Sequence, residues 1–185
     1  MMIIDGKKEA EILRQEIKKE IESLKSKDNK VPGLTVILIG DFAPSQIYVK
    51  NKEKSAKEVG INSNVIRYSK EVTEEEVLKK IEDLNNDTNV SGILVQLPLP
   101  PQINKEKIIN AVSPKKDVDG FHPINVGNLS SGHHALVPCT PLGCLYLIKK
   151  VEKNLSGKHA VIIGRSNLNG KPMACLLYTS PSPRD

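Results

Sequence analysis

Hydrophobic residues recur along this chain with two different spacings, and each spacing predicts its own kind of secondary structure. Residues 7–26 carry apolar side chains every three or four positions with charges between them, which is typical of an amphipathic helix. Residues 34–40, LTVILIG, form a nearly continuous β-branched run. Such a run predicts a strand that is buried on both faces of a sheet.

The two patterns go on alternating as far as about residue 112. The next predicted elements are a helix in residues 44–60, a weaker strand in 61–68, a helix in 73–87, a strand that begins in 91–101 and a short helix in 104–112. Thr73 is the expected N-cap of its helix, ahead of an acidic first turn. Strands and helices in this order imply parallel strands with right-handed crossovers, so we predict an α/β fold with a three-layer, parallel-sheet domain.

A second region follows the turn-rich segment 113–127. Thr140 is expected to cap a helix in which Pro141 is the first helical residue. Residues 158–164, KHAVIIG, are predicted to form another strand, which a tight loop joins to a helix after Gly170. This order is typical of the start of a Rossmann-like domain.

Composition narrows the classes of function. A net charge of +5 over 185 residues suits an anionic small molecule, and two Phe, four Tyr and no Trp argue against stacking on nucleic acid. Three cysteines with unsuitable spacing, and the adjacent His133 and His134, predict no metal site. Reduced thiols, no secretory leader pattern and no apolar run of membrane-spanning length predict a cytoplasmic protein without a membrane partner.

One lysine stands apart from its neighbours in the helix of residues 44–60. Lys52 shares a helical face with Ser45 and Tyr48, whereas Lys50 and Lys54 point to the solvated side. A partly buried lysine is useful as a proton donor or acceptor. The alternative is an ordinary Tyr/Lys surface pair.

Two further polar residues are expected near this lysine. In an open parallel sheet, ligands bind beyond the carboxyl ends of the strands. Lys52 lies in the helix that follows the first strand, Gln96 lies near the end of a later strand, and Asp119 lies in the loop after that. Taken singly, Gln96 could be a hydrogen-bonding residue at a strand end, and Asp119 could belong to a turn before Gly120.

The loop between Gly164 and Gly170 has the features of a phosphate site. It combines glycines, which permit close backbone approach, with the start of a helix. Its spacing is neither the dinucleotide pattern of three glycines nor a P-loop, so a plain strand-to-helix turn is the alternative. Arg165 could pair with an extra phosphate, which would favour NADP over NAD.

Five motifs together resemble one enzyme family from about residue 3 to Ala174. SQIYVKNKEKSAKEVGI, GILVQLPLP, PKKDVDGFHPINVGNL, PCTPLG and VIIGRSNLNGKPMA are similar, in order and spacing, to the bifunctional methylenetetrahydrofolate dehydrogenase/cyclohydrolases. The resemblance implies oxidation of methylenetetrahydrofolate with NADP and hydrolysis of the methenyl product to formyltetrahydrofolate. These reactions belong to one-carbon metabolism and tetrahydrofolate interconversion, which supply purine biosynthesis.

The resemblance also implies a role for each candidate residue. Tyr48 would stack along the folate rings, Lys52 would be the catalytic lysine hydrogen-bonded to Gln96, and Asp119 would hold the pterin. Val95 and Leu97 would line the same substrate site. The residues expected to bind NADP are Gly164, Arg165, Ser166 and Thr140.

The resemblance further implies a domain organisation. Residues 1–139 would form the folate-binding catalytic domain, and residues 140–174 would begin the NADP-binding domain. Residues 175–185 would be an anomalous tail that ends a C-terminally truncated chain, and the homodimer implied for the full-length family would be lost with the missing part. One alternative stays open, a cofactor-free folate-binding or interaction fragment. Among enzymes, the second candidate is a Lys/Asp dehydrogenase resembling shikimate dehydrogenase, but that family would not require Tyr48 above Lys52 or Gln96.

Overall fold

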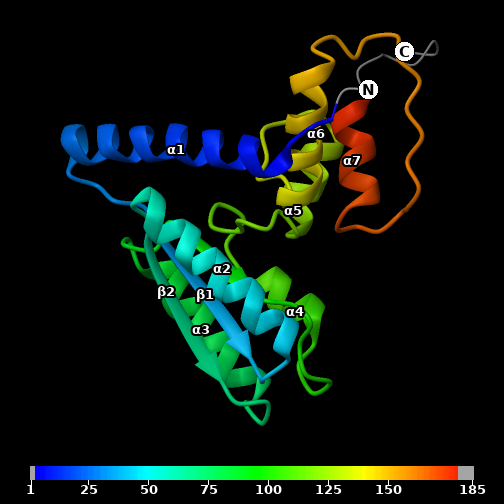
Figure 1. Ribbon diagram of the computed structural model, residues 1–185. Coiled ribbons are helices and arrows are strands. Elements are labelled where there is room, and N and C mark those ends of the chain that lie inside the picture. Colours follow the sequence, from blue (N-terminus) through cyan, green and yellow to red (C-terminus); the bar gives the residue numbers. More distant parts are fainter. Residues whose placement is uncertain (1–2, 179–185) are drawn as a thin grey trace. The chain divides into compact units, whose positions relative to one another are not determined.

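The structure is a computed structural model that describes residues 3–178 (Figure 1). The chain divides into two compact units between Asp117 and Val118. Residues 10–117 form what we call the sheet unit, and residues 3–9 with 118–178 form the helical unit. The predicted domain boundary after Cys139 falls inside the helical unit, and the assignment of residues 1–139 to one functional domain stays a prediction.

The sheet unit is built on three parallel strands. They are β1 (Gly33–Ile39), β2 (Asn62–Tyr68) and β3 (Gly92–Val95). Their order is β2-β1-β3, so the β-branched β1 is the central strand, and Ile37 pairs with Ile66 on one side and Val95 on the other. Its position between two neighbours explains why almost every residue of β1 is buried.

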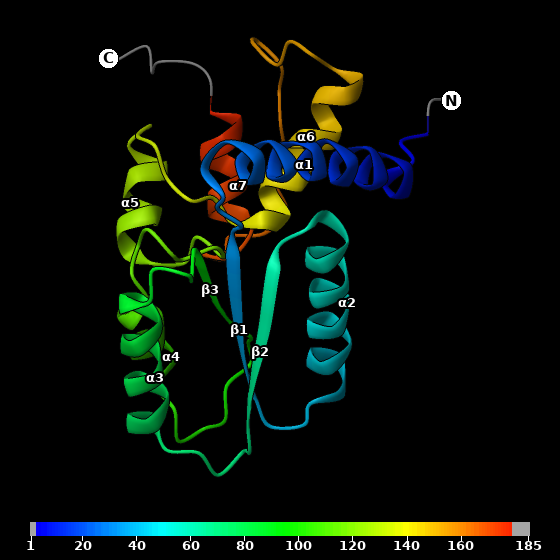
Figure 2. The ribbon, with the colours of Figure 1, turned by 90° about the vertical axis from the view of Figure 1, so that its left-hand side faces the viewer.

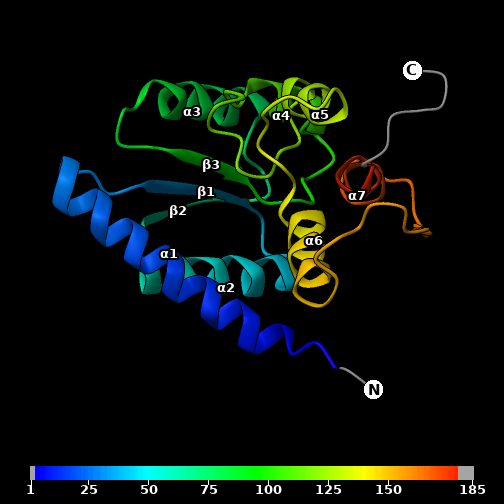
Figure 3. The same cartoon turned by 90° about the horizontal axis from the view of Figure 1, so that it is seen from above.

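Helices cover both faces of this sheet. From β1 the chain moves outward through α2 (Ala43–Val59) to β2, and then returns through α3 (Glu74–Asn86) across β1 to β3. Right-handed crossovers that run in opposite directions place their helices on opposite faces of a sheet. Accordingly, α2 lies on one face, and α3 lies on the other face together with α4 (Lys105–Ala111) (Figures 2 and 3). The predicted three-layer α/β fold is therefore confirmed.

The first helix and the main core complete this unit. α1 (Gly6–Asp28) buries Ile21, and Arg14 Nε of α1 lies 3.8 Å from Glu58 Oε1 near the end of α2. A hydrophobic core cluster lies between the sheet and α3 with α4. It includes Ile37, Val77, Ile81, Ile93 and Ile108.

The start of α3 is held by a reciprocal capping box. The Thr73 side chain accepts a hydrogen bond from the Glu76 N–H, and the Glu76 carboxylate accepts one from the Thr73 N–H. The Thr73 backbone N–H, and then its hydroxyl, lower the pKa of Glu76 below its ordinary value of 4.5. The predicted N-cap at Thr73 is confirmed.

The capping box makes the stability of α3 depend on pH. The pKa of Glu76 is lower in the folded chain than in the unfolded chain, so its ionised carboxylate stabilises the fold. This stabilisation is fully present at pH values above the unfolded-state pKa and is lost as the pH falls through the folded-state pKa. Glu76→Gln is therefore expected to lower stability at neutral pH and to differ little from the unmodified chain at a pH below the folded carboxyl pKa. Urea titrations of both chains across this pH range test it, and a difference that does not change with pH would contradict it.

The helical unit contains α5 (Pro123–Ser130), α6 (Cys139–Val151) and α7 (Gly170–Leu177), and α7 contacts both other helices. α5 lies partly within the segment that we expected to be only turns. Pro123 occupies its first turn and His122 Nδ1 accepts a hydrogen bond from the Ile124 N–H, 3.1 Å away. In the part of the chain that the structure describes, no helix is both long and apolar enough to cross a membrane.

The predicted cap of α6 is wrong by two residues. The helix begins at Cys139, and Pro138 occupies the N-cap position without a capping side chain. Thr140 is therefore an exposed residue of the first turn. Pro141 is buried, and its missing N–H costs nothing in this turn, where the N–H groups have no partners within the helix.

The predicted strand at residues 158–164 is absent. The segment has no regular secondary structure, Val161 is 79% exposed and Ile163 is fully exposed. A parallel strand needs a neighbour to pair its backbone N–H and C=O groups, and no described part of the helical unit is a strand. Of the predicted tail, Cys175 to Leu177 belong to α7, while residues 179–185 lie outside the described part.

Candidate functional site

The topology of the sheet unit creates a natural binding position at the carboxyl ends of β1 and β3. The chain leaves β1 in one direction and reaches β3 after reversing, so these adjacent strands meet at a topological switch point. α2 starts a few residues after β1, and Gln96 directly follows β3. The sequence therefore brings a helix and a strand end to the same edge of the sheet.

Lys52 and Gln96 meet at this position, although they are 44 residues apart in the chain. Lys52 Nζ donates a hydrogen bond to Gln96 Oε1 over 3.3 Å, and both side chains are half-buried. The backbone N–H of Gln96 donates to the Ile37 carbonyl of β1, at 2.9 Å, which ties Gln96 to the central strand. The hydrogen bond that the family resemblance implied is present.

The direct hydrogen-bond partner of Lys52 is neutral, because the nearest carboxylate in the sequence is paired with another lysine. The adjacent Glu53 carboxylate is bound by Lys57, whose Nζ lies 2.6 Å from Glu53 Oε1, and the hydrogen bond and charge of Lys57 lower the pKa of Glu53. The Gln96 amide oxygen accepts a hydrogen bond from the Lys52 ammonium and carries no negative charge. The direct hydrogen-bond partner of Lys52 is therefore uncharged.

Tyr48 stands one turn before Lys52 on α2 and is 63% exposed. An exposed aromatic ring beside a half-buried amine suits a flat ligand that lies on the helix. Val95 and Leu97, which flank Gln96, are half-buried. Val95 packs against the core cluster that α3 and α4 cover. The shared substrate site of Tyr48, Val95 and Leu97 around Lys52 stays a prediction.

Asp119 belongs to the helical unit, directly after the division of the chain. The segment that leads to it is anchored in the sheet unit, because Asp117 pairs with Ile93 of β3 and the Ile93 N–H donates to the Lys116 carbonyl at 2.7 Å. Asp119 itself is half-buried. Its predicted contact with the ligand of Lys52 stays a prediction.

The loop from Gly164 to Gly170 is tightly closed. A Cβ atom on Gly170 would lie 2.2 Å from the Gly164 carbonyl oxygen, so only glycine permits this approach. The Lys171 N–H donates to the Ser166 carbonyl at 3.0 Å, and the Asn169 N–H donates to Ser166 Oγ at 3.1 Å. No strand leads into this loop, and the approach of a phosphate to its backbone stays a prediction.

The side chains of this loop fit an anionic group. Arg165 and Ser166 are both exposed. Because Ser166 Oγ accepts a hydrogen bond from the Asn169 N–H, its own hydrogen remains available to donate. A guanidinium and a hydroxyl beside a closed glycine turn are suitable donors for a phosphate.

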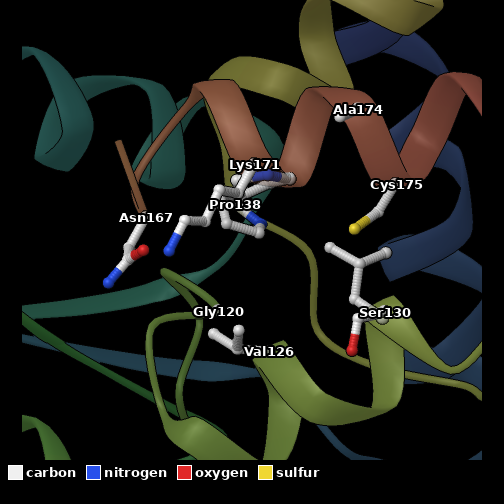
Figure 4. Close-up of a pocket in the computed structure, with 10 residues that line it drawn as sticks. Gly120, Val126, Ser130, Pro138, Asn167, Lys171, Ala174 and Cys175 are labelled. Atoms are coloured by element: carbon white, nitrogen blue, oxygen red, sulfur yellow. The ribbon is translucent and has the colours of Figure 1, made fainter. Parts of the chain in front are cut away.

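A cavity of about 320 Å³ lies within the helical unit, between α5 and α7 (Figure 4). Gly120, which follows Asp119, lines it together with Pro138, Asn167 and Lys171. The cavity is therefore lined both by a residue next to Asp119, the predicted pterin-binding residue, and by residues of the predicted phosphate loop and the helix that follows it. Sequence reasoning missed Asn167 and Lys171, although both lie in the glycine loop motif.

Gly120 shapes one wall of this cavity. Its φ is +67°, and an added Cβ would lie 2.5 Å from the Leu136 carbonyl oxygen and 2.8 Å from the Pro138 nitrogen. Gly120→Ala is expected to destabilise the helical unit by about 1–3 kcal/mol through backbone strain and this clash. Hydrogen exchange of residues 118–138 measures the effect.

Gly132→Ala is the matched control for this substitution. Gly132 has a similar φ of +73°, but an added Cβ would meet nothing within 4 Å. The difference between the two variants therefore isolates the clash from the strain. Equal hydrogen-exchange protection in the Gly120→Ala and Gly132→Ala variants would contradict the close packing around Gly120.

Comparison with known proteins matches two family models. The model of the tetrahydrofolate dehydrogenase/cyclohydrolase catalytic domain matches residues 4–119, which is well over half of the chain. The model of the tetrahydrofolate dehydrogenase/cyclohydrolase NAD(P)-binding domain matches residues 138–182.

Individual relatives agree with these matches. The bifunctional protein FolD of Pelagibacter ubique is 66% identical over 177 residues, which cover 96% of this chain and 63% of the relative. The crystal structure of the bifunctional enzyme FolD from Campylobacter jejuni superposes with a TM-score of 0.93 at 48% identity, over 96% of this chain and 63% of that one. The Trypanosoma brucei enzyme, solved with NADP cofactor and inhibitor, gives a TM-score of 0.90 at 33% identity, over 95% and 60%.

This chain thus spans somewhat less than two thirds of the length of these relatives. The matched residues include Lys52, Gln96 and the whole sheet unit. On this evidence the chain belongs to the tetrahydrofolate dehydrogenase/cyclohydrolase family.

Proposed function

We propose that this chain carries the folate-binding and proton-transfer residues of an NADP-dependent methylenetetrahydrofolate dehydrogenase and methenyltetrahydrofolate cyclohydrolase. The observation that carries the proposal is the hydrogen bond between Lys52 and Gln96 at the switch point of the sheet. It combines a mobile proton with a neutral acceptor at the position where open α/β sheets bind ligands.

The substrate-binding roles follow from exposure and position. The exposed ring of Tyr48 stacks along the flat part of the folate, and Val95 and Leu97 line the site on either side of Gln96. Asp119 accepts hydrogen bonds from the pterin ring nitrogens.

Hydrolysis of the methenyl group requires a proton to move twice. In its amine form, Lys52 takes a proton from the water that attacks the methenyl carbon. In its ammonium form, it returns the proton to the nitrogen that is released when the carbon–nitrogen bond breaks. The remaining hydroxyl proton of the adduct passes to solvent water as the formyl C=O forms. Gln96 holds the Lys52 side chain in place and leaves both forms accessible.

The closed glycine loop is the proposed site for NADP. Gly164, Arg165 and Ser166 would hold its phosphates and ribose, with Arg165 paired to the phosphate that distinguishes NADP from NAD. Thr140, exposed in the first turn of α6, is a further residue proposed to contact NADP. When bound, NADP supplies the hydride acceptor for the dehydrogenase reaction.

A cytoplasmic location and a homodimer of the complete protein belong to the same proposal. The first rests on the cysteine usage, since no cysteine among the described residues forms a disulfide. The second rests on the family resemblance. Light scattering after size-exclusion chromatography measures the oligomeric state.

The test compares this chain with a fusion in which the corresponding C-terminal part of the Pelagibacter relative continues it after Ala174. We expect a folate analogue to protect both proteins against thermal unfolding, and the fusion to hydrolyse methenyltetrahydrofolate and to reduce NADP with methylenetetrahydrofolate. A fusion that binds folate but catalyses neither reaction would contradict the proposal and favour a folate-binding protein without enzymatic activity.

A further inference from the structure

Ser45 lies on the same face of α2 as Tyr48 and Lys52, one turn before the first and two turns before the second. Its side chain is only 4% exposed, in contrast to the exposed Tyr48. A buried hydroxyl must find a hydrogen-bond partner or lose free energy. The partner of Ser45 connects it to the site.

Ser45 Oγ donates to the backbone carbonyl of Leu97 over 3.4 Å. The same carbonyl accepts a hydrogen bond from Gln96 Nε2 at 2.8 Å. Leu97 O is thus a shared acceptor that joins α2 to the side-chain amide of Gln96, across 52 residues of sequence.

These contacts decide which way the Gln96 amide points. A backbone carbonyl can only accept a hydrogen bond, so the end of the amide that faces Leu97 O must be the nitrogen. The oxygen then faces Lys52 Nζ, which as an ammonium can only donate. A rotated amide would place two acceptors against each other at one end and two donors at the other.

We propose that Ser45 is a positioning residue, which holds the Leu97 carbonyl so that the Gln96 amide presents its oxygen to Lys52. Ser45 does not contact Lys52 in this proposal. It affects Lys52 indirectly, through the hydrogen bonds that the Leu97 carbonyl and the Gln96 amide form. The proposal deepens the function proposed above, since it concerns the residue that transfers the proton.

The test measures the chemical reactivity of Lys52 in this chain. Acetylation of individual lysines by limiting acetic anhydride is followed by mass spectrometry across a pH series, with the exposed Lys50 as internal reference. In Ser45→Ala the Lys52 amine loses an oriented acceptor. We expect its acetylation rate relative to Lys50 to change by about two- to five-fold, as for the loss of one neutral hydrogen bond, and its pH profile to shift.

Three further variants separate positioning from general loosening of the fold. Ser45→Thr keeps the hydroxyl and is expected to retain the reactivity of the unmodified chain, and Ser45→Cys, a weak donor of similar size, is expected to be intermediate. Ser63→Ala is the matched control, because Ser63 Oγ is buried in the same unit but finds no partner among the described residues. It should leave the Lys52 profile unchanged.

The outcomes are distinct from those for the proposed function, because acetylation does not require catalysis. If Ser45→Ala and Ser45→Cys, both folded by circular dichroism, give the Lys52 profile of the unmodified chain, the positioning role is overturned. A changed profile that Ser63→Ala reproduces overturns it as well. Loss of enzymatic turnover in the fusion, with a Ser45-dependent Lys52 profile in this chain, would overturn only the proposed function.

Discussion

Replacing Lys52 with methionine is expected to reduce the hydrolysis of methenyltetrahydrofolate by about 10²- to 10⁴-fold, the usual contribution of a positioned proton donor and acceptor. Methionine retains an unbranched apolar side chain but has no ammonium group to donate to Gln96. The fold of α2 should therefore persist while proton transfer stops. The loss of methenyltetrahydrofolate absorbance in the fusion protein measures the rate.

Lys50→Met is the control, since Lys50 is exposed on the same helix and points away from the site. We expect it to retain normal turnover. Both variants should bind a folate analogue with affinities close to that of the unmodified fusion, measured by isothermal titration calorimetry. Normal turnover in Lys52→Met would remove Lys52 from the proposed mechanism.

Truncating Ile81 to alanine is expected to lower the free energy of unfolding by about 2–5 kcal/mol. Ile81 lies on α3, is fully buried and belongs to the cluster that includes Ile37 of β1 and Ile93 of β3. Alanine would leave a cavity between the helix and the two strands whose carboxyl ends form the site. Urea titration of this chain, followed by far-ultraviolet circular dichroism, measures the loss.

Two variants calibrate this measurement. Ile81→Val removes one methylene group and should cost about 0.5–1.5 kcal/mol. Glu82→Ala changes an exposed neighbour on the same helix and should stay within about 0.5 kcal/mol of the unmodified chain. An alanine variant at position 81 that costs no more than Glu82→Ala would mean that this core is not closely packed.

The sheet unit was predictable because its local signals agree with one another. The β-branched run of β1, the capping residue Thr73 and the apolar stripes of α1 and α3 each indicate the element that the structure contains. The hydrogen bond between Lys52 and Gln96 is different, because no local pattern encodes a contact across 44 residues. The predicted sheet topology indicated that the two residues lie close together, and the family resemblance indicated the hydrogen bond itself.

The helical unit was harder to predict for reasons that differ between elements. α5 was missed because it is short, contains Pro123 and Gly127, and follows His122, which is not a common N-cap residue. Residues 158–164 have much the same composition as β1, yet they form no strand. Composition reports the preference of a segment for extended backbone, whereas strand formation also requires a neighbour.

The contact between Lys52 and Gln96 also constrains how the site comes into existence during protein synthesis. Lys52 leaves the ribosome long before Gln96, and the two can meet only after β3 has paired with β1, on the side away from β2. Early folding of β1, α2 and β2 would thus produce a helix whose Lys52 still lacks its acceptor. The arrangement of Lys52 and Gln96 that the proposed proton transfer needs therefore forms late in the synthesis of this unit, when this long-range contact is made.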